Sequence, residues 1–231
     1  MQPASYKSMT STSHIASNIE KIRNTLPQNC KLVVVSKYRE LWEIEGAYAT
    51  GQRMFAENRV QALMERAEAL PTDIQWHLIG HLQTNKVKYI APFIAMIHAV
   101  DSFKLLQEID KEAAKHNRLI PCLIQLHVAE EETKFGLTPE ETHAFFDAFN
   151  EAKLKHVRIV GLMAMASNTD NLAQISAEFA VVKNCFEDIK AHYFQHDDQF
   201  RELSIGMSSD YPIAIEHGST LIRVGSAVFA E

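Results

Sequence analysis

Short runs rich in β-branched residues alternate with helix-like segments along most of this chain, and this alternation constrains the fold more than any other feature. Several runs, such as LVVV and IVGLMAM, are almost wholly apolar, as expected for parallel strands covered on both faces. The pattern predicts eight strands: Leu32–Lys37, Arg53–Glu57, Ile74–Gly80, Met96–Asp101, Pro121–Ala129, Arg158–Met165, Leu203–Met207 and Leu221–Val224.

The segments between these runs have the spacing of amphipathic helices. The sequence predicts a helix over Phe103–His116 and another over Pro139–Lys155, with Thr138 as its N-cap. Before the first strand, a helix capped by Ser13 would present an apolar face made of Ile15, Ile19, Ile22 and Leu26.

Eight alternations of strand and helix in 231 residues predict a closed (β/α)₈ TIM barrel. The alternative is an open doubly wound sheet, which would usually carry a glycine-rich GxGxxG turn after its first strand. Here the first strand ends in Ser36, Lys37 and Tyr38. We therefore expect a flexible N-terminus at residues 1–12, then one α/β barrel domain at residues 13–231 with an extra N-terminal helix.

Composition excludes several classes of partner. The 23 Lys and Arg residues against 29 Asp and Glu give a net charge of −6, which argues against electrostatic binding of nucleic acid. No run of about 18 apolar residues is present, and the polar N-terminus does not resemble a signal peptide. Three scattered cysteines indicate neither disulfides nor a zinc site. These features predict a cytoplasmic protein without a metal ion, a membrane partner or a nucleic-acid partner.

Barrel active sites lie at the carboxyl ends of the strands, so polar residues that follow the apolar runs are the candidates for chemistry. Lys37 is the sharpest of them. A lysine at the end of an apolar strand is partly removed from water, which favours the free amine needed for Schiff-base formation. The alternative for Lys37 is a solvated residue at the barrel rim.

Two short Gly/Ser segments, SIGMSSD and RVGSAVF, follow the last two predicted strands. The loops at this place in a barrel commonly bind phosphate through backbone N–H groups. Hydroxyl donors and close backbone approach would come from Ser208, Ser209, Gly225 and Ser226. The alternative is that these residues serve turn geometry alone.

A lysine, a phosphate cradle and the neighbouring Arg223 together describe a site for pyridoxal 5′-phosphate (PLP). If Arg223 faced the pyridine nitrogen, its charge would disfavour protonation of that nitrogen and weaken the cofactor as an electron sink. Such a site favours holding the cofactor over demanding catalysis. The alternative for Arg223 is a salt bridge at the barrel rim.

The chain resembles the YggS/PROSC family of pyridoxal phosphate homeostasis proteins, relatives of the barrel domain of bacterial alanine racemase. The matching segments are LVVVSKY, FAENRVQ, WHLIGHLQTNK, HAVDS, KFG, GLMAMA and LSIGMSSDYPIAIEHGSTLIRVGSAVF. The resemblance implies that Lys37 holds PLP as a Schiff base and that Arg223 faces the ring nitrogen. It implies a phosphate site at Ser208, Ser209, Gly225 and Ser226, and a pocket lined by Asn58, His81, Met163 and Met207. The chain departs from the family pattern at Ala56 and His127, which leaves pocket specificity open.

The resemblance also implies a role in PLP homeostasis, as a protein that stores, delivers or buffers the cofactor without efficient catalysis. PLP-dependent apoenzymes are the candidate acceptors, and a monomer is expected because the dimer surface of the racemases is not part of this chain. The chain ends at Glu231, which leaves no room for the second domain that supplies an opposing tyrosine in the racemases. Two alternatives remain: a weak PLP-dependent amino-acid racemase, and a barrel enzyme for phosphorylated sugars that uses a lysine imine and binds no chromophore.

Overall fold

The computed structural model describes residues 12–129 and 135–231, and it places the eight predicted strands in one parallel sheet. The order of neighbours is β7-β6-β5-β4-β3-β2-β1-β8. The strands are β1 (Lys31–Val35), β2 (Met54–Glu57), β3 (Gln75–Leu78), β4 (Met96–Val100), β5 (Ile120–Leu126), β6 (Val157–Ala164), β7 (Glu202–Ser204) and β8 (Leu221–Val224).

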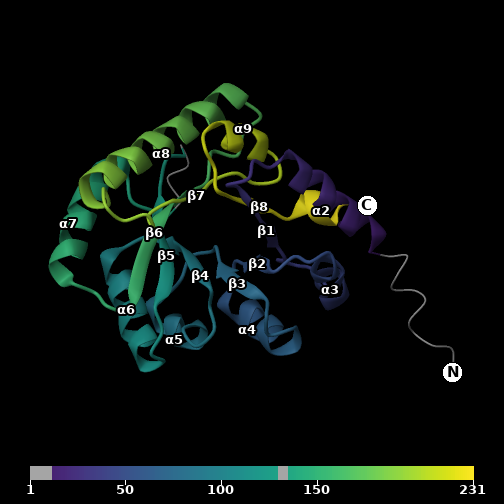
Figure 1. Ribbon diagram of the computed structural model, residues 1–231, viewed down its shortest axis with the longest axis horizontal. Helices are drawn as coiled ribbons and strands as arrows, with labels where there is room; N and C mark the ends of the chain where they lie inside the picture. Colours follow the sequence, from purple (N-terminus) through teal and green to yellow (C-terminus); the bar gives the residue numbers. More distant parts are fainter. Residues whose placement is uncertain (1–11, 130–134) are drawn as a thin grey trace.

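The sheet curls into a barrel whose last gap lies between β7 and β8. Across this gap the backbone N–H of Thr220 donates to Leu203 O at 2.9 Å, and the N–H of Arg223 donates to Gly206 O at 2.9 Å. The strands therefore form the inner wall of a nearly closed TIM barrel with helices outside it (Figure 1), and the predicted fold is confirmed.

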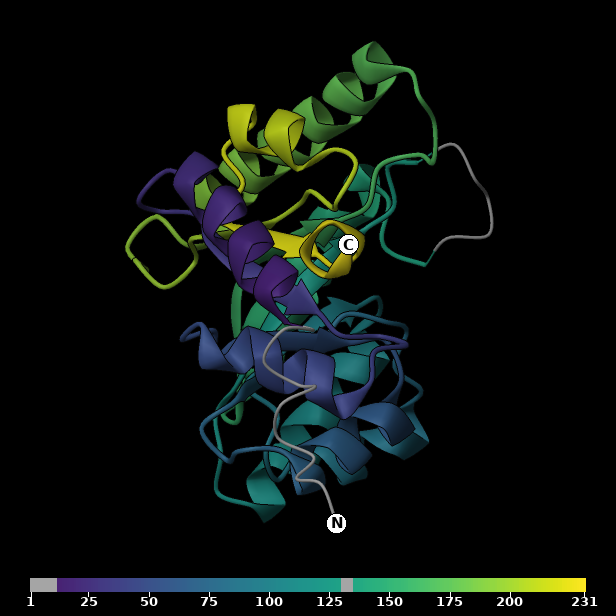
Figure 2. The same ribbon diagram turned by 90° about the vertical axis from the view of Figure 1, so that its right-hand side faces the viewer.

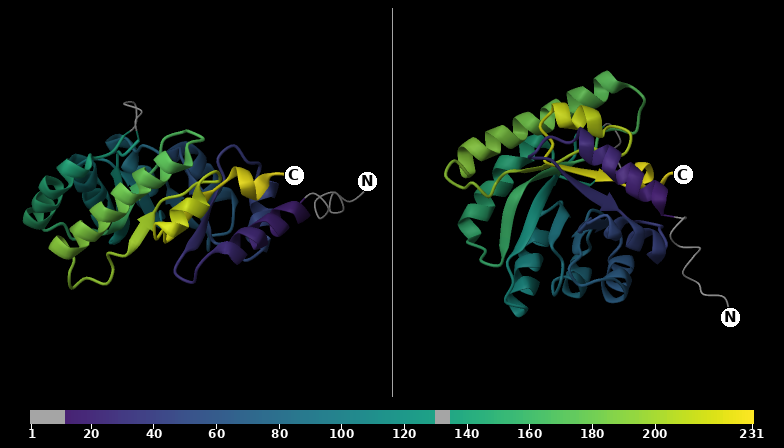
Figure 3. Two further views of the ribbon diagram at one scale, coloured as in Figure 1. Left: turned by 90° about the horizontal axis from the view of Figure 1, so that it is seen from above. Right: turned by 45° about the vertical axis from the view of Figure 1, so that its right-hand side comes forward.

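The helices that surround this wall follow the strands in turn. They are α2 (Ser13–Thr25), α3 (Leu41–Ala49), α4 (Val60–Ala69), η1 (Thr84–Lys86), α5 (Val87–Ile90), α6 (Phe103–Lys115), η2 (Pro139–Glu141), α7 (Thr142–Ala152), α8 (Leu172–Tyr193), α9 (Tyr211–Glu216) and α10 (Ser226–Phe229). The long helix α8 runs along the outside of β6 and contacts α9 (Figure 3). No described helix is long and apolar enough to cross a membrane.

Alternation within each strand divides the core into two parts. On β1, Val33 and Val35 belong to a small apolar cluster inside the barrel, whereas Leu32 and Val34 pack in the larger cluster between the strands and the helices. Both faces of this strand are therefore buried, which is why its sequence is a continuous apolar run.

The N-terminal helix closes the outer layer beside the C-terminus. Helix α2 lies next to α10 in both side views (Figures 1 and 2), and Asn18 Nδ2 donates to Val228 O and Ala230 O at 3.2 and 2.8 Å. Its buried residues Ile15, Ile19 and Ile22 are three of the four predicted. The prediction that Ser13 caps this helix is wrong, because Ser13 is the first helical residue and the N-cap position is Thr12.

Several other predicted boundaries, among them the ends of β1, β3, β5 and α7, shift by up to three residues, and two of these shifts have a local reason. Thr138 is an N-cap with a capping box to Glu141, as predicted, but the first turn after it is a 3₁₀ turn. Strand β7 ends at Ser204 instead of Met207. The chain turns at Gly206, where φ is 96° and an added Cβ would lie 2.6 Å from the Cβ of Ala214. The predicted terminus at residues 1–12 falls almost wholly outside the described residues.

Candidate functional site

A cavity of about 580 Å³ opens at the carboxyl ends of the barrel strands. Its wall combines the ends of β1 and β8 with the loops that follow β1, β2, β3, β6, β7 and β8. The lining residues are Val35, Lys37, Tyr38, Arg39, Asn58, Ile79, Gly80, Met165, Met207, Ser208, Ser209, Arg223, Gly225 and Ser226. Segments separated by nearly 200 residues in the sequence thus share one wall.

Eight of the ten residues predicted from the sequence to contact the cofactor meet in this cavity. Lys37, Asn58, Met207, Ser208, Ser209, Arg223, Gly225 and Ser226 line it, and Met163 and His81 do not. Met163 is fully buried in the cluster inside the barrel, and Met165, two residues further along, lines the cavity instead. His81 lies in the loop after β3, where Nδ1 contacts Asp101 Oδ2 at 2.8 Å and the ring stacks on Phe135 at 3.9 Å.

Lys37 lies in the turn that follows β1, and its side chain is exposed at the cavity. The prediction that the Lys37 amine is partly removed from water is therefore not met in the protein without a bound molecule. The reason is local: Lys37 lies two residues beyond the strand, and the next residue, Tyr38, has a φ of 64° and a side chain that is 74% exposed. This turn leaves the amine accessible to a molecule in the cavity.

A buried ion pair fixes the backbone beneath Lys37. Glu57, at the end of β2, is 1% exposed, pairs with Arg66 of α4 and accepts a hydrogen bond from Ser36 Oγ at 2.5 Å. The guanidinium of Arg66 also donates to Ser36 O at 2.7 Å and to Arg39 O at 2.8 Å. The segment that carries Lys37 is thus held at both ends by one side chain. Nothing in the sequence pattern singles out Arg66, which lies 29 residues after Lys37.

Backbone donors without an acceptor gather in the two Gly/Ser loops. Within the described part of the chain, the backbone N–H groups of Ser208, Ser209 and Ser226 have no hydrogen-bond acceptor. Ser208 Oγ ties the loops together, because it accepts from the N–H groups of Gly225 and Ala227 at 3.3 Å each. Free N–H groups that converge on a cavity are a general means of binding an anion such as phosphate.

Gly225 permits this arrangement because the β8 loop approaches β1 closely. An added Cβ at Gly225 would lie 2.9 Å from Val35 O and 3.2 Å from Val35 Cβ. On the other side, Asp210 is 3% exposed and its Oδ1 accepts a hydrogen bond from Met207 N at 2.5 Å, which holds the β7 loop in its turn.

Arg223 is a buried cation that meets no carboxylate among the described residues. It is 3% exposed, and Nη1 donates to Ser204 O at 2.6 Å and to Ser204 Oγ at 2.7 Å, while Nη2 donates to Ala164 O at 2.9 Å. Burial lowers the pKa of Arg223 to about 10, so the guanidinium stays charged at neutral pH. The described contacts therefore do not include the salt bridge that was the alternative for this residue.

These contacts leave donors of Arg223 for a bound molecule. Three of the five guanidinium N–H groups are used, and the other two have no acceptor in the described part of the protein. The residue lines the cavity, which also carries Lys37 and Arg39 and no described carboxylate. The site is thus electropositive. It has a primary amine at one side and, at another, N–H donors that can bind an anion.

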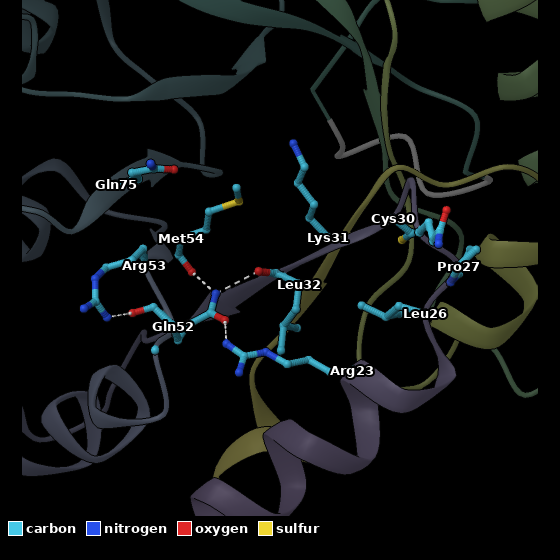
Figure 4. A pocket seen from close by; sticks show the side chains of 12 residues that line it. Arg23, Leu26, Pro27, Cys30, Lys31, Leu32, Gln52, Arg53, Met54 and Gln75 are labelled. Atoms are coloured by element: carbon cyan, nitrogen blue, oxygen red, sulfur yellow. Dashed lines mark hydrogen bonds between the residues drawn. The ribbon is translucent and has the colours of Figure 1, made fainter.

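A second cavity, of about 440 Å³, lies at the opposite end of the barrel, where the strands begin (Figure 4). Its arginines are engaged within the protein: Arg23 Nη2 donates to Gln52 Oε1 at 2.7 Å, and Arg53 Nε donates to Asp73 Oδ2 at 2.6 Å. Lys31 points away from the pair formed by Gln52 and Arg23 (Figure 4).

One exposed cluster outside both cavities has side chains that metals can use. His143, Asp188 and His192 lie on α7 and α8, with His143 Nε2 2.7 Å and His192 Nδ1 3.1 Å from the Asp188 carboxylate. The other ring nitrogen of His143 contacts the Tyr193 hydroxyl at 3.1 Å. These mutual hydrogen bonds account for the cluster as a surface network.

Comparison with known proteins places this geometry in context. A family model described as "Alanine racemase, N-terminal domain" matches residues 10–231. A pyridoxal phosphate homeostasis protein of Aquifex aeolicus is 36% identical over 206 residues, which cover 88% of this chain and 88% of that protein. PipY of Synechococcus elongatus, solved with PLP bound, is 34% identical with a TM-score of 0.83, covering 94% of this chain and 100% of that one.

A more distant structure shares the fold alone. Alanine racemase from E. faecalis is 16% identical with a TM-score of 0.70, and the alignment covers 96% of this chain and 58% of the racemase.

Proposed function

Because the chain belongs to the family of pyridoxal phosphate homeostasis proteins, within the wider group that shares the N-terminal domain of alanine racemase, we propose that it binds PLP in the cavity at the carboxyl ends of its strands. One observation carries the proposal: the same cavity is lined by an accessible lysine, by three backbone N–H groups and by a buried arginine with two further donors, and none of these five donors has an acceptor among the described residues.

The donor set fits the functional groups of PLP one by one. The aldehyde needs a primary amine, which Lys37 supplies by forming a C=N bond, a Schiff base, with release of water. The phosphate needs several N–H or hydroxyl donors, which the loops with Ser208, Ser209, Gly225 and Ser226 supply. The ring nitrogen is a hydrogen-bond acceptor. Arg223 offers N–H donors to it and stays protonated at neutral pH, so it would not transfer a proton to the ring.

When bound, PLP would supply a reactive aldehyde and a conjugated ring that can accept electrons. The residues of this chain restrain the second property. A positively charged guanidinium beside the ring nitrogen disfavours protonation there, and this reduces the capacity of the ring as an electron sink. Lys37 is the residue that would hold the aldehyde, and its exposed amine would be open to exchange with another amine.

We therefore propose a carrier that stores PLP and releases it to PLP-dependent apoenzymes, in place of an efficient enzyme. Racemisation needs one group to remove a proton and another to return it from the opposite face. Apart from Lys37 and the two arginines, Tyr38 is the only titratable side chain among the described lining residues. Turnover of alanine or serine at enzyme-like rates, lost in a Lys37→Ala variant, would favour the racemase instead.

Three finer points belong to the same proposal. We expect a monomer, which light scattering coupled to size-exclusion chromatography would measure. We expect it to work in the reducing cytoplasm, in keeping with three cysteines that are all free and buried. We also expect Asn58 and Met207 to contact the cofactor. His81 and Met163 do not line the cavity, so we expect no direct contact from them.

The visible absorbance spectrum of the protein mixed with PLP tests the site, followed by borohydride reduction and peptide mapping by mass spectrometry. The expected result is an imine band and a reduced phosphopyridoxyl adduct on Lys37. A colourless protein that takes up no PLP would overturn the proposal and leave the barrel as a phosphate-binding enzyme of another kind.

A further inference from the structure

A chain of four buried polar residues crosses the inside of the barrel and ends at Arg223. His77 Nδ1 lies 2.9 Å from His98 Nε2, and His98 Nδ1 lies 3.0 Å from Ser204 Oγ. The same hydroxyl accepts from Arg223 Nη1 at 2.7 Å. The four residues come from β3, β4, β7 and β8, and each is at most 3% exposed.

One set of hydrogen-bond directions gives the proton of the Ser204 hydroxyl an acceptor within this chain. Arg223 can only donate, so it uses an acceptor site of the Ser204 hydroxyl. In the described part of the protein, the hydroxyl has one other side-chain partner, His98 Nδ1, which is the acceptor of the hydroxyl proton in this set. His98 then carries its proton on Nε2 and donates to His77 Nδ1, which leaves the proton of His77 on Nε2.

Both imidazoles are neutral in this arrangement, and the surroundings favour that state. Burial lowers the pKa of His77 to about 4, with a smaller contribution from the positive charge of Lys31. Burial lowers the pKa of His98 well below its usual value, helped by His77 and by Arg223. A neutral histidine has one donor and one acceptor, so each ring passes a hydrogen bond on.

The rest of the barrel interior shows that polarity is not required for packing here. Most neighbouring interior positions are apolar, and the buried Gln125 of β5, which donates to Phe135 O, is an exception; the apolar positions are Val33, Ala56, Leu123, Val160 and Met163. Burying polar groups without need costs stability, and an apolar core of the same shape is generally at least as stable. The polar chain is thus a departure from the barrel's own pattern, and it leads to the one buried cation among the described residues of the cavity wall.

We propose that His77, His98 and Ser204 are positioning residues that act through Arg223. They hold its guanidinium by a directed set of acceptors, so that its two remaining N–H groups are presented to the ring nitrogen of the bound cofactor. This inference rests on the proposed function and deepens it, because it names the residues that fix how the ring nitrogen is recognised.

The first test needs no cofactor. Nitrogen-15 NMR of the histidine rings in the cofactor-free protein reports which nitrogen carries the proton. The expected result is the Nε2–H form for both His77 and His98, with His77 neutral down to about pH 4. In Ser204→Ala the proton donor to His98 Nδ1 is lost, so the His98 signals should change. The Nδ1–H form, or protonation near pH 6, would overturn the chain.

The second test uses PLP and a matched control. Ser219 is also buried, at 1% exposed, and its hydroxyl donates to Ile205 O at 2.7 Å without touching Arg223. Ser204→Ala should weaken PLP binding about tenfold, the effect of losing one charge-assisted hydrogen bond. It should also change the pH dependence of the absorbance band, and Ser204→Thr, which restores a hydroxyl, should return it toward that of the unaltered protein. Ser219→Ala should leave affinity and pH profile unchanged.

The outcomes separate this inference from the proposed function. If the unaltered protein takes up no PLP, the proposed function fails, and the positioning role fails with it whatever the NMR shows. If the unaltered protein binds PLP but Ser204→Ala has the same affinity and pH profile, only the positioning role is overturned. A loss of thermal stability without a change in the absorbance profile would also overturn the positioning role, because it marks Ser204 as a core residue only.

Discussion

The two ends of the barrel each carry a cavity lined by cationic side chains, and among the described residues the arginines of the two cavities differ in how far their donors are used. The cavity where the strands begin, about 440 Å³, contains Arg23 and Arg53, whose guanidiniums are bonded to Gln52, to Asp73 and to backbone carbonyls. The cavity where the strands finish, about 580 Å³, has three unpaired backbone N–H groups and two unpaired N–H groups of Arg223 within the described part of the chain.

This difference teaches that neither size nor positive charge makes a binding site. At the amino end, Gln52 Nε2 donates to Leu32 O and Met54 O, so it ties β1 to the start of β2. The polar groups there stabilise the fold. At the carboxyl end, the loops after β7 and β8 leave donors that have no acceptor within residues 12–129 and 135–231, at a cost that a bound anion would offset.

The largest contrast should come from the lysines near the two ends of β1. Lys37→Ala removes the only described amine in the carboxyl-end cavity, so we expect complete loss of the imine absorbance and of the borohydride-trapped adduct. Lys31→Ala removes the lysine of the amino-end cavity and should leave both readouts unchanged. An adduct that persists in Lys37→Ala and disappears in Lys31→Ala would reverse the assignment of the two cavities.

Ion pairs give the next contrast. Glu57→Ala leaves Arg66, whose side chain is 12% exposed, without its carboxylate beneath Lys37, which should cost about 3 kcal/mol of unfolding free energy. At the amino end, Arg53→Ala breaks a pair whose side chains are 38% and 54% exposed, and the loss should be about 1 kcal/mol or less. Urea titrations of the two variants measure both values.

The same variants should differ in cofactor chemistry. Glu57→Ala frees the segment that Arg66 holds at Ser36 O and Arg39 O, so imine formation at Lys37 should also weaken. Equal destabilisation by Glu57→Ala and Arg53→Ala would mean that the buried pair contributes no more than the exposed one.

The residues of the carboxyl-end cavity were predictable where position along a strand determines them. Lys37, Ser208 and Gly225 follow apolar runs, and a parallel barrel brings the ends of such runs together. The choice between Met163 and Met165 depends on how deep each side chain lies in the barrel. Strand β6 has a register shift against β5 and a φ of 154° at Gly161, so simple alternation does not give that depth.

The buried partners were not predictable, because they depend on closure of the barrel. His98 and Ser204 are 106 residues apart in the sequence, and they meet only because β4 and β7 face each other across the barrel interior. In the sequence, Arg66 resembles any other arginine of an amphipathic helix. Only the folded structure shows that its guanidinium contacts the turn after β1. Sequence patterns predict which residues end the strands. The residues that support them from inside the barrel and from the helices become visible only in the closed barrel.

Acid should reveal the buried chain that lies between the two ends. His77 has its pKa lowered to about 4 by burial, so the unfolded chain binds a proton near pH 6.5 that the folded protein refuses until about pH 4. The contribution to stability is complete above pH 6.5 and is lost as the pH falls to 4. A difference of about 2.5 pH units corresponds to about 3 kcal/mol.

His77→Gln provides the control for this titration, because other groups also respond to acid. The pH dependence of unfolding free energy should be flatter in this variant between pH 6.5 and 4. Lys31→Ala should reduce the acid effect slightly, since Lys31 lowers the pKa of His77 by charge repulsion. If wild type and His77→Gln lose the same stability between pH 6.5 and 4, His77 is protonated in the folded protein and the directed chain is wrong.

The smallest effects should separate a stabilising polar group from a binding one. Gln52→Ala at the amino end removes the side-chain donor to two backbone carbonyls and one of the two acceptors of Arg23, so we expect a stability loss of about 1–3 kcal/mol with no change in PLP affinity. Ser208→Ala at the carboxyl end removes an acceptor whose two hydrogen bonds are long, at 3.3 Å, so its stability loss should be below about 1 kcal/mol. PLP affinity in Ser208→Ala should nevertheless fall several-fold, because the hydroxyl and the loop geometry that it fixes would both contribute to phosphate binding.

Thermal melts and equilibrium PLP titrations of the two variants test this contrast. If the two ends differ as their hydrogen bonds indicate, Gln52→Ala loses stability and keeps PLP affinity, whereas Ser208→Ala keeps most of its stability and loses PLP affinity. Parallel losses in both measurements would show that the free donors at the carboxyl end are not what distinguishes it.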